Sequence, residues 1–365
     1  MLEDAKVTSK QLIFLVVISR IVITITFFPA LNGPPGNQDV WMSELLSFPA
    51  SLLLTTPIYL LWKRFPTQSL IEYCQTILGK TGIIIGFVYV LYFIHSLSVF
   101  LYQWSAFLTT AVMPETPVLF ILLLLFPFCA YAVSKGIEVI ARLAEFFAPL
   151  VFGGLIVIFL FLSKDMDLKV FTPFMEKGIL PIIMGSFLIA SRTSEILILA
   201  MLLPYLNAKK RNTQIVFLSS FSLMAFFWVI STVTVLATLG LDLTRLLQFA
   251  YFTAVRLVNI GDFIERIESI HLAIWILSGF LRISLYYYIT LMGLSQAIGL
   301  KNYKAIILPT LTILLPISLA IQSNIADLNE YSYSIESWFN IVFIFLIPTF
   351  LLSIAMLRKQ GENKV

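Results

Sequence analysis

The chain consists of long apolar runs separated by short polar or Pro/Gly-rich breaks. A helix that crosses a bilayer needs about 20 apolar residues, and ten runs approach or exceed that length. Only 12% of the residues are charged, whereas a soluble domain carries roughly a quarter, so a cytosolic enzyme is excluded. The sequence therefore predicts an all-α polytopic membrane protein with ten transmembrane helices. We place the spans at residues 11–31, 42–62, 81–112, 117–134, 139–162, 179–204, 213–239, 263–298, 304–322 and 335–357.

The positive charges orient these spans. With the N-terminus in the cytoplasm, fifteen of the 24 lysines and arginines lie in cytoplasmic segments, five lie in external loops and four lie in spans. Cytoplasmic loops of membrane proteins are enriched in Lys and Arg. Both termini are therefore predicted to be cytoplasmic.

Ten spans in a single transmembrane domain, residues 1–365, are compatible with an inverted five-plus-five repeat. An odd number of helices in the first half, about 11–162, reverses the orientation of the second half, about 179–357. Neither Cys74 nor Cys129 belongs to a CxxC or His/Cys cluster, so no metal site is indicated. We find no HExxH, GxSxG or phosphate-loop motif. We therefore expect no enzymatic activity and no cofactor, and the net charge of +4 gives no support to nucleic-acid binding.

The sixth span is interrupted by five consecutive polar residues, which run from Ser191 to Glu195. Five polar residues in a row surround a helix, so an unbroken helix would expose some of them to lipid. A break lined by protein or water is lower in energy, and Gly185 adds a second weak point. Broken helices form midplane sites in many transporters, so Gly185, Ser191 and Glu195 are candidate ligand-binding residues. Alternatively, Arg192 and Glu195 neutralise each other and only hold helices together.

The first span is interrupted more weakly, by Arg20, Thr24 and Thr26 ahead of Pro29. These three polar residues are candidates for the same ligand site. Arg20 could face the cavity beside Glu195. It could equally extend its side chain to a lipid headgroup, because it lies only about nine residues from the predicted cytoplasmic end of the span.

The eighth span has a one-sided polar pattern. At 100° per residue, one stripe carries Glu265, Glu268, His271, Trp275, Gly279, Arg282 and Tyr286. The rest of this helix is largely apolar, so the stripe is predicted to face the protein interior. Arg282 lies deep and needs a partner or a water-filled cavity. His271, Trp275 and Arg282 are therefore candidate ligand-binding residues.

Two parts of this stripe have alternative interpretations. Glu265, Arg266 and Glu268 lie near the predicted outer interface, where a solvated ion-pair cluster with a structural or gating role is the simpler interpretation. His271 is either a hydrogen-bonded histidine of the helix bundle or a proton relay that titrates near neutral pH.

The third and fifth spans carry further polar groups. On the third span, Ser96 and Gln103 belong to a narrow stripe of small and polar residues. Such stripes allow close helix packing, and these two residues are also candidates for the ligand site. On the fifth span, Glu138, Arg142 and Glu145 share one face and can pair locally. We interpret this second group as structural or as part of an inner gate.

The eighth span also carries a family signature. Its stretch Phe263–Ser269 (FIERIES), followed by Trp275, resembles the F-[IL]-E-R-x-[ED]-x…W signature of the GerAB-type spore germination permeases, the B subunits of endospore germinant receptors. Weaker similarities occur in the family's order at Gln38–Trp41, Glu72–Lys80, Gly136–Arg142 and Glu195–Arg211. The resemblance extends over essentially the whole chain.

The resemblance implies a ten-helix fold of the amino acid-polyamine-organocation superfamily, similar to LeuT, with inverted repeats and interrupted first and sixth helices. It also implies a place in the spore inner membrane, in a complex with an A subunit and a lipoprotein C subunit. Members of the family sense small nutrients such as amino acids. The B subunit is expected to hold the nutrient where a transporter would hold its substrate.

Two departures from the family pattern affect the expected ligand. The stretch Ile21–Pro29 lacks the Gly-x-Gly run that is common in the family, and Thr193 and Ser194 precede Glu195 where a glycine is frequent. Both changes remove backbone freedom where a ligand carboxylate would meet bare N–H groups. A germinant other than an ordinary amino acid, or weak binding in a divergent paralogue, would fit these differences.

The sequence leads to two functional hypotheses. In the first, the chain is a nutrient-sensing subunit that binds a small polar, amino acid-like germinant among the first, third, sixth and eighth spans and thereby triggers germination. In the second, the chain is an amino acid permease that moves its substrate with H⁺ through Glu195 or His271. An intramembrane enzyme is a third hypothesis without a supporting motif.

Overall fold

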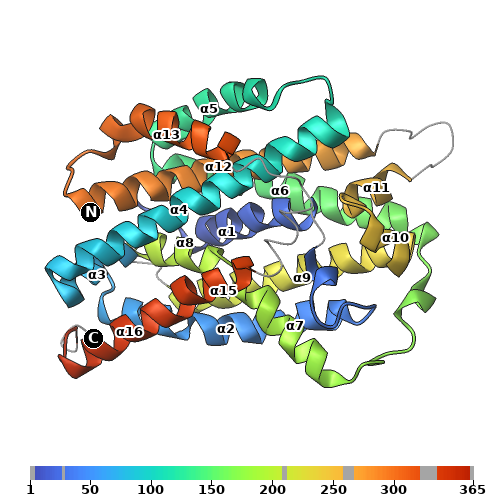
Figure 1. The fold of residues 1–365 in the computed structure, drawn as a ribbon, viewed down its shortest axis with the longest axis horizontal. Helices are drawn as coiled ribbons and strands as arrows, with labels where there is room; N and C mark the ends of the chain where they lie inside the picture. Colours follow the sequence, from blue (N-terminus) through green and yellow to red (C-terminus); the bar gives the residue numbers. More distant parts are fainter. Residues whose placement is uncertain (1–4, 27–28, 208–211, 258–266, 321–334, 362–365) are drawn as a thin grey trace.

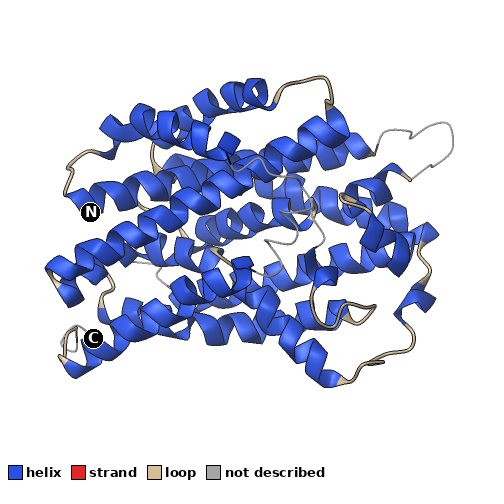
Figure 2. Cartoon of the chain, in the orientation of Figure 1, coloured by secondary structure: helices blue, strands red, loops and turns tan. Residues whose placement is uncertain are grey.

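The computed structural model describes residues 5–26, 29–207, 212–257, 267–320 and 335–361. Helices make up the regular structure of these ranges (Figure 2). No β-strand occurs among them, and the one bridge, between Val7 and Leu206, is isolated. The prediction of an all-α chain is confirmed.

The helices follow one another along the chain, with a long connection between α6 and α7 (Figure 1). The long elements are α1 (Ser9–Thr24), α2 (Val40–Arg64), α4 (Lys80–Phe107) with its extension η2 (Leu108–Val112), α5 (Val118–Ser134), α6 (Ile137–Leu162), α7 (Ile179–Ser191), α8 (Glu195–Leu202), α9 (Thr213–Leu239), α12 (Glu268–Ile298) and α13 (Ile307–Ala320). The last span is a series of α15 (Glu336–Ile341), η10 (Val342–Leu346) and α16 (Ile347–Leu357). Short helices are α3 (Leu70–Leu78), α10 (Leu241–Leu246) and α11 (Ala250–Arg256).

Seven of the described helices are long and apolar enough to cross a membrane, and the bent pair α7–α8 makes an eighth. By length and composition, the chain is therefore an integral membrane protein. The other two predicted spans coincide with α1, of 16 residues, and α5, of 17 residues, which are shorter than the roughly 20 residues of a typical span.

The first span ends earlier than the sequence predicts. It was expected to reach residue 31, whereas α1 ends at Thr24. Near its end, the hydroxyls of Thr24 and Thr26 donate to the carbonyls of Arg20 and Val22, four residues back. Such bonds compete with the helix ladder, and the nearby Pro29 cannot continue it. At its other end α1 begins with a capping box, in which Thr8 and Gln11 exchange hydrogen bonds.

The polar part of the bundle is organised around α1 and α12. Helix α1 packs against α6, α9 and α12, and ten of its 16 residues are buried. Helix α12 buries 20 of its 31 residues, whereas α6 buries only nine of 26. The other face of α6 exposes large apolar side chains such as Phe146 and Leu160, as expected for a surface that meets lipid. From His271 to Tyr286, the stripe on α12 thus faces protein, as predicted.

Candidate functional site

The α7–α8 pair is broken where the sequence predicts a break. Helix α7 ends at Ser191, α8 begins at Glu195, and the two helices meet at 43°. All five polar residues of this stretch are buried. The carbonyl of Arg192 accepts a hydrogen bond from Nη1 of Arg20 at 3.0 Å. The polar residues at the break are therefore turned into the protein rather than toward lipid.

Glu195 is the centre of a buried charge cluster. Its Oε1 pairs with Nη1 of Arg282, and its Oε2 lies 3.8 Å from Nη1 of Arg20. The carboxylate is fully buried, and the two arginine side chains are at most 10% exposed. Nη1 of Arg282 also donates to the carbonyl of Ser19, at 2.6 Å. The cluster therefore joins α1, α8 and α12, and Arg20 points into the protein rather than to a headgroup.

The cluster contains more cations than anions. Arg20 and Arg282 both pair with the carboxylate of Glu195, while a further buried arginine, Arg192, donates from its Nε to the hydroxyl of Ser337 at 3.0 Å. Two guanidinium groups thus share one carboxylate within this cluster. A buried charge is stable only when it is paired, so this arrangement favours a ligand that carries negative charge.

Aromatic rings enclose the two arginines that bind Glu195. The guanidinium carbon of Arg20 lies 5.0 Å from the centre of the Trp228 ring, and that of Arg282 lies 4.6 Å from the centre of the Tyr286 ring. Cation–π contacts of this kind are stabilising when desolvated. The hydroxyl of Tyr286 lies 2.5 Å from that of Ser194, which ties α12 to the break. Sequence reasoning placed Tyr286 on the stripe but missed Trp228 altogether.

A small cavity lies beside the cluster. It has a volume of about 20 Å³ and is lined by Ile23, His95, Ser96, Val99, Phe100, Gln103, Ser194, Arg282, Glu336, Phe339 and Asn340. It brings together the predicted residues Ser96, Gln103 and Arg282 from α4 and α12. A single water needs roughly 10–15 Å³, whereas ligand pockets usually measure about 300–1,000 Å³. This cavity is therefore too small for a ligand the size of an amino acid.

An aromatic layer covers the other end of the α12 stripe. Trp275 donates to the hydroxyl of Thr26 at 2.7 Å and stacks on Trp104, with ring centres 4.8 Å apart. A Cβ on Gly279 would lie 2.1 Å from Nε1 of Trp104, so only glycine permits this stacking. Thr26 and Trp275, both predicted ligand residues, thus pair with each other across α1 and α12.

His271 lies beyond this layer, away from the charge cluster. Its ring is buried among the rings of Tyr251, Phe252 and Phe107, at 5.5, 5.4 and 6.2 Å between centres. Neither ring nitrogen has a hydrogen-bond partner among the described residues. It is eleven residues from Arg282 on the same helix, or about 16 Å along the axis. The structure does not bring His271 together with Glu195.

Thr24 and Gly185 occupy positions at helix contacts. The hydroxyl of Thr24 accepts a hydrogen bond from Nε1 of Trp228 at 2.6 Å, next to Arg20. A Cβ on Gly185 would lie 2.2 Å from the carbonyl oxygen of Pro34 and 2.7 Å from the hydroxyl of Ser43. Gly185 therefore allows α7 to approach α2 closely and lies within α7, six residues before the break.

The predicted structural or gating ion pairs are found in different places. Glu138 pairs with Arg142 on the exposed face of α6. Glu145 takes partners from α1, Lys10 at 3.0 Å and the side chain of Gln11 at 3.0 Å, so it connects two helices instead of extending the local pair. Glu268 is half-buried in the first turn of α12. Glu265 and Arg266 lie outside the described residues.

Sequence reasoning missed one buried carboxyl group. Glu44, on α2, is only 5% exposed. Its Oε1 accepts a hydrogen bond from the hydroxyl of Thr232 on α9 at 2.6 Å. The sequence does contain a signal, because Glu44 is an acidic residue inside the predicted span 42–62. A charge at membrane depth is costly unless it faces protein or water, and this holds for Glu44 as it does for Arg20 and Glu195.

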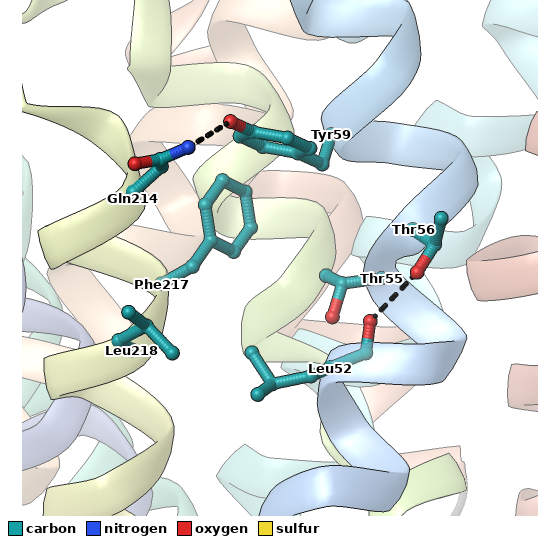
Figure 3. Close-up of a pocket in the computed structure, with 7 residues that line it drawn as sticks. All are labelled: Leu52, Thr55, Thr56, Tyr59, Gln214, Phe217 and Leu218. Atoms are coloured by element: carbon teal, nitrogen blue, oxygen red, sulfur yellow. Dashed lines mark hydrogen bonds between the residues drawn. The ribbon is translucent and has the colours of Figure 1, made fainter.

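A larger cavity lies in the groove between α2 and α9, remote from the predicted site residues. Figure 3 shows the seven side chains that line it: Leu52, Thr55, Thr56, Tyr59, Gln214, Phe217 and Leu218. Its volume is about 390 Å³. Nε2 of Gln214 donates to the hydroxyl of Tyr59 at 3.2 Å across one end of the groove. The lining carries no charged group and none of the predicted ligand residues, so we place the candidate site at the charge cluster instead.

Comparison with known proteins identifies the family. The chain matches the family described as "Spore germination protein" over residues 6–328. Spore germination protein KB of Bacillus subtilis (strain 168) is 27% identical over 100% of this chain and 98% of its own length. Spore germination protein YndE of the same organism is 24% identical over 98% and 99%, and spore germination protein XB of Bacillus anthracis is 28% identical over 47% and 48%. The chain therefore belongs to the spore germination protein family, as the signature on the eighth span predicts.

Proposed function

We propose that this protein is the nutrient-sensing B-type subunit of a germinant receptor. In this proposal it binds a small polar, amino acid-like germinant at the charge cluster and thereby triggers germination. The observation that carries the proposal is Glu195, which lies at a helix break and is held by Arg282 and Arg20 from two other helices. Membership of the spore germination protein family supports it.

We infer a ten-span fold for this role, with two inverted five-helix repeats in one transmembrane domain. The bent pair α7–α8 and the early end of α1 support interrupted sixth and first helices. The excess of Lys and Arg in the segments assigned to the cytoplasm supports cytoplasmic termini. The site of action would be the spore inner membrane, in a complex with A and lipoprotein C subunits.

The geometry suggests how binding becomes a signal. A carboxylate on the germinant would share the guanidinium groups of Arg20 and Arg282 with Glu195. Because the cavity holds only about 20 Å³, the germinant can enter only when α4 and α15 move away from α12. A ligand shifts such an equilibrium by the difference between its affinities for the two forms. The partner subunits would recognise the open form.

The test has two steps. A nutrient screen of spores that lack this protein identifies the germinant by the response that is lost. The purified protein is then reconstituted in proteoliposomes with that nutrient. Saturable binding without flux, weakened by Arg282→Lys and unchanged by Glu138→Gln, is the expected result. Sustained accumulation driven by an ion gradient would contradict the sensor and support a permease, and a screen with no lost response would contradict both.

A further inference from the structure

Glu44 is a buried acid whose partners leave it half satisfied. Its Oε1 is bound by the hydroxyl of Thr232, and its Oε2 has no hydrogen-bond partner in the described part of the chain. No described residue forms an ion pair with it. An ionised carboxylate buried in this way is strongly disfavoured, because it has lost its hydration without gaining a counter-ion.

The described helices that pack most closely on α2 offer no cation to pair with Glu44. Helices α7 and α9, which pack most closely on α2, contain no Asp, Glu, His, Lys, Arg, Tyr or Cys, and neither do η10 and α16. Helix α8 also contacts α2 and carries only Glu195, an acid already bound by two arginines. On α2 itself, Lys63 lies nineteen residues away, or about 28 Å along the axis.

The nearest acid in the sequence has its own partners. One carboxylate oxygen of Asp39, just before α2, accepts from Nδ2 of Asn37 at 3.1 Å, and the other accepts from the backbone N–H of Met175 at 3.0 Å. These bonds hold the loop that contains Asp39 and do not involve Glu44. Glu44 thus differs from Asp39 and Glu195 in having a single neutral donor and no ion pair among the described residues.

We propose that Glu44 is a proton-binding site. In its neutral, protonated form it stabilises the packing of α2 against α9. When the acid is neutral, Oε1 keeps its bond to Thr232 and Oε2 carries the proton within an apolar interface. Loss of the proton to water leaves a carboxylate that only water or a cation can stabilise. Water must therefore reach the carboxylate before the proton is released, which we expect to happen when α2 and α9 separate at this end.

The antiparallel α2–α9 interface provides an internal control. Glu44 pairs with Thr232 at one end of the interface, and Tyr59 pairs with Gln214 at the other, so each end has one hydrogen bond between side chains. The Tyr59–Gln214 bond joins a phenol to an amide and involves no carboxyl group. Gln214→Leu should therefore weaken the interface equally at acidic and mildly alkaline pH.

The experiment measures unfolding and infrared spectra of the full-length protein in lipid nanodiscs. The wild type should show a carboxylic-acid carbonyl band at neutral pH that Glu44→Gln removes. Between acidic and mildly alkaline pH, the folded-to-unfolded ratio of the wild type should fall at least about tenfold more than that of Glu44→Gln. The sign follows because a group held as the neutral acid contributes stability below its titration range and loses it as pH rises.

Each outcome decides the proposal. Parallel stability curves for wild type and Glu44→Gln, or an unchanged carbonyl band in that variant, would overturn it. If Glu44→Gln does not fold, Thr232→Val serves in its place, because loss of the hydrogen bond to a neutral acid must shift the carbonyl band. An unshifted band in Thr232→Val would also overturn the proposal. None of these measurements uses a germinant, so they are independent of the sensing role.

Discussion

Two buried glutamates of this protein have opposite surroundings. Glu195 is held by Arg282 and Arg20 at a break in a helix, whereas Glu44 lies in an unbroken helix with one hydroxyl as its partner. Each carboxyl group is almost wholly buried. The first environment supplies two positive charges to the carboxyl group, and the second supplies none among the described residues. The same residue type can thus serve as an anchor for charge in one place and as a proton carrier in another.

This difference decides how each site responds to a ligand. In the proposed role, a carboxylate-bearing germinant competes with Glu195 for the arginines of the charge cluster. No described residue forms an ion pair with Glu44 at the α2–α9 interface, so in our proposal this site exchanges only a proton. Variants that keep the shape of each carboxyl group but change its charge separate these two roles, and their expected effects differ widely in size.

Glu195→Gln should have the largest effect. It leaves the guanidinium groups of Arg282 and Arg20 buried without their counter-ion, and removal of one partner from a buried pair usually costs about 3–5 kcal/mol. Chemical or thermal unfolding of the purified protein in nanodiscs measures the change. A loss below about 1 kcal/mol would show that the arginines find other partners and that the cluster does not depend on Glu195.

Thr232→Val should have an intermediate effect. It removes the donor to Glu44 and leaves both oxygens of a buried carboxyl group unbound, which costs about 1–3 kcal/mol. The same unfolding assay applies, with Thr56→Val as the matched control because Thr56 is exposed on the same interface and bonds only to a carbonyl of its own helix. Equal losses of stability in the two variants would show that the Glu44–Thr232 bond contributes no more than the local hydrogen bond of Thr56.

Glu44→Gln should change the stability at neutral pH by less than about 1 kcal/mol. The amide has nearly the shape of the neutral acid and its oxygen still accepts from Thr232, so little is lost if the acid was already neutral. A loss as large as that of Glu195→Gln would mean that Glu44 is ionised and has a partner in the native protein. This comparison of two Glu→Gln changes is the sharpest contrast between the two sites.

Glu138→Gln should have the smallest effect. Its partner Arg142 is 68% exposed on the outer face of α6, and exposed pairs contribute about 0–1 kcal/mol. We expect stability and folded yield close to those of the wild type, as measured by the same unfolding assay and by quantitative blotting. A loss comparable with that of Glu195→Gln would instead support a gating role for the Glu138–Arg142 pair.

The sequence predicts the broken helix and the family well, for identifiable reasons. Five adjacent polar residues cannot all avoid lipid on a straight helix, so the break before Glu195 follows from local pattern alone. The buried stripe on α12 follows in the same way from helical periodicity. The FIERIES signature predicts the family, although its residues up to Arg266 lie outside the described part of the chain.

Other features depend on contacts between distant parts of the chain. The direction of Arg20 could not be decided, because it depends on Glu195 and Trp228 being brought to α1 by other helices. The size of the cavity depends on how Phe100 and Phe339 pack beside Arg282, which no pattern encodes. Glu44 was missed because a single acid near the end of a span looks like an interfacial residue until its depth is known.

The central claim is that the charge cluster at Glu195 receives the germinant. Its most direct test is the germination dose–response of spores that carry Glu195→Gln or Arg282→Lys, next to Glu138→Gln, at matched levels of folded protein. We expect the first two variants to need at least about tenfold more germinant, equivalent to about 1.4 kcal/mol of binding free energy, and Glu138→Gln to respond like the wild type. Full and equal responses from all three variants would contradict the account.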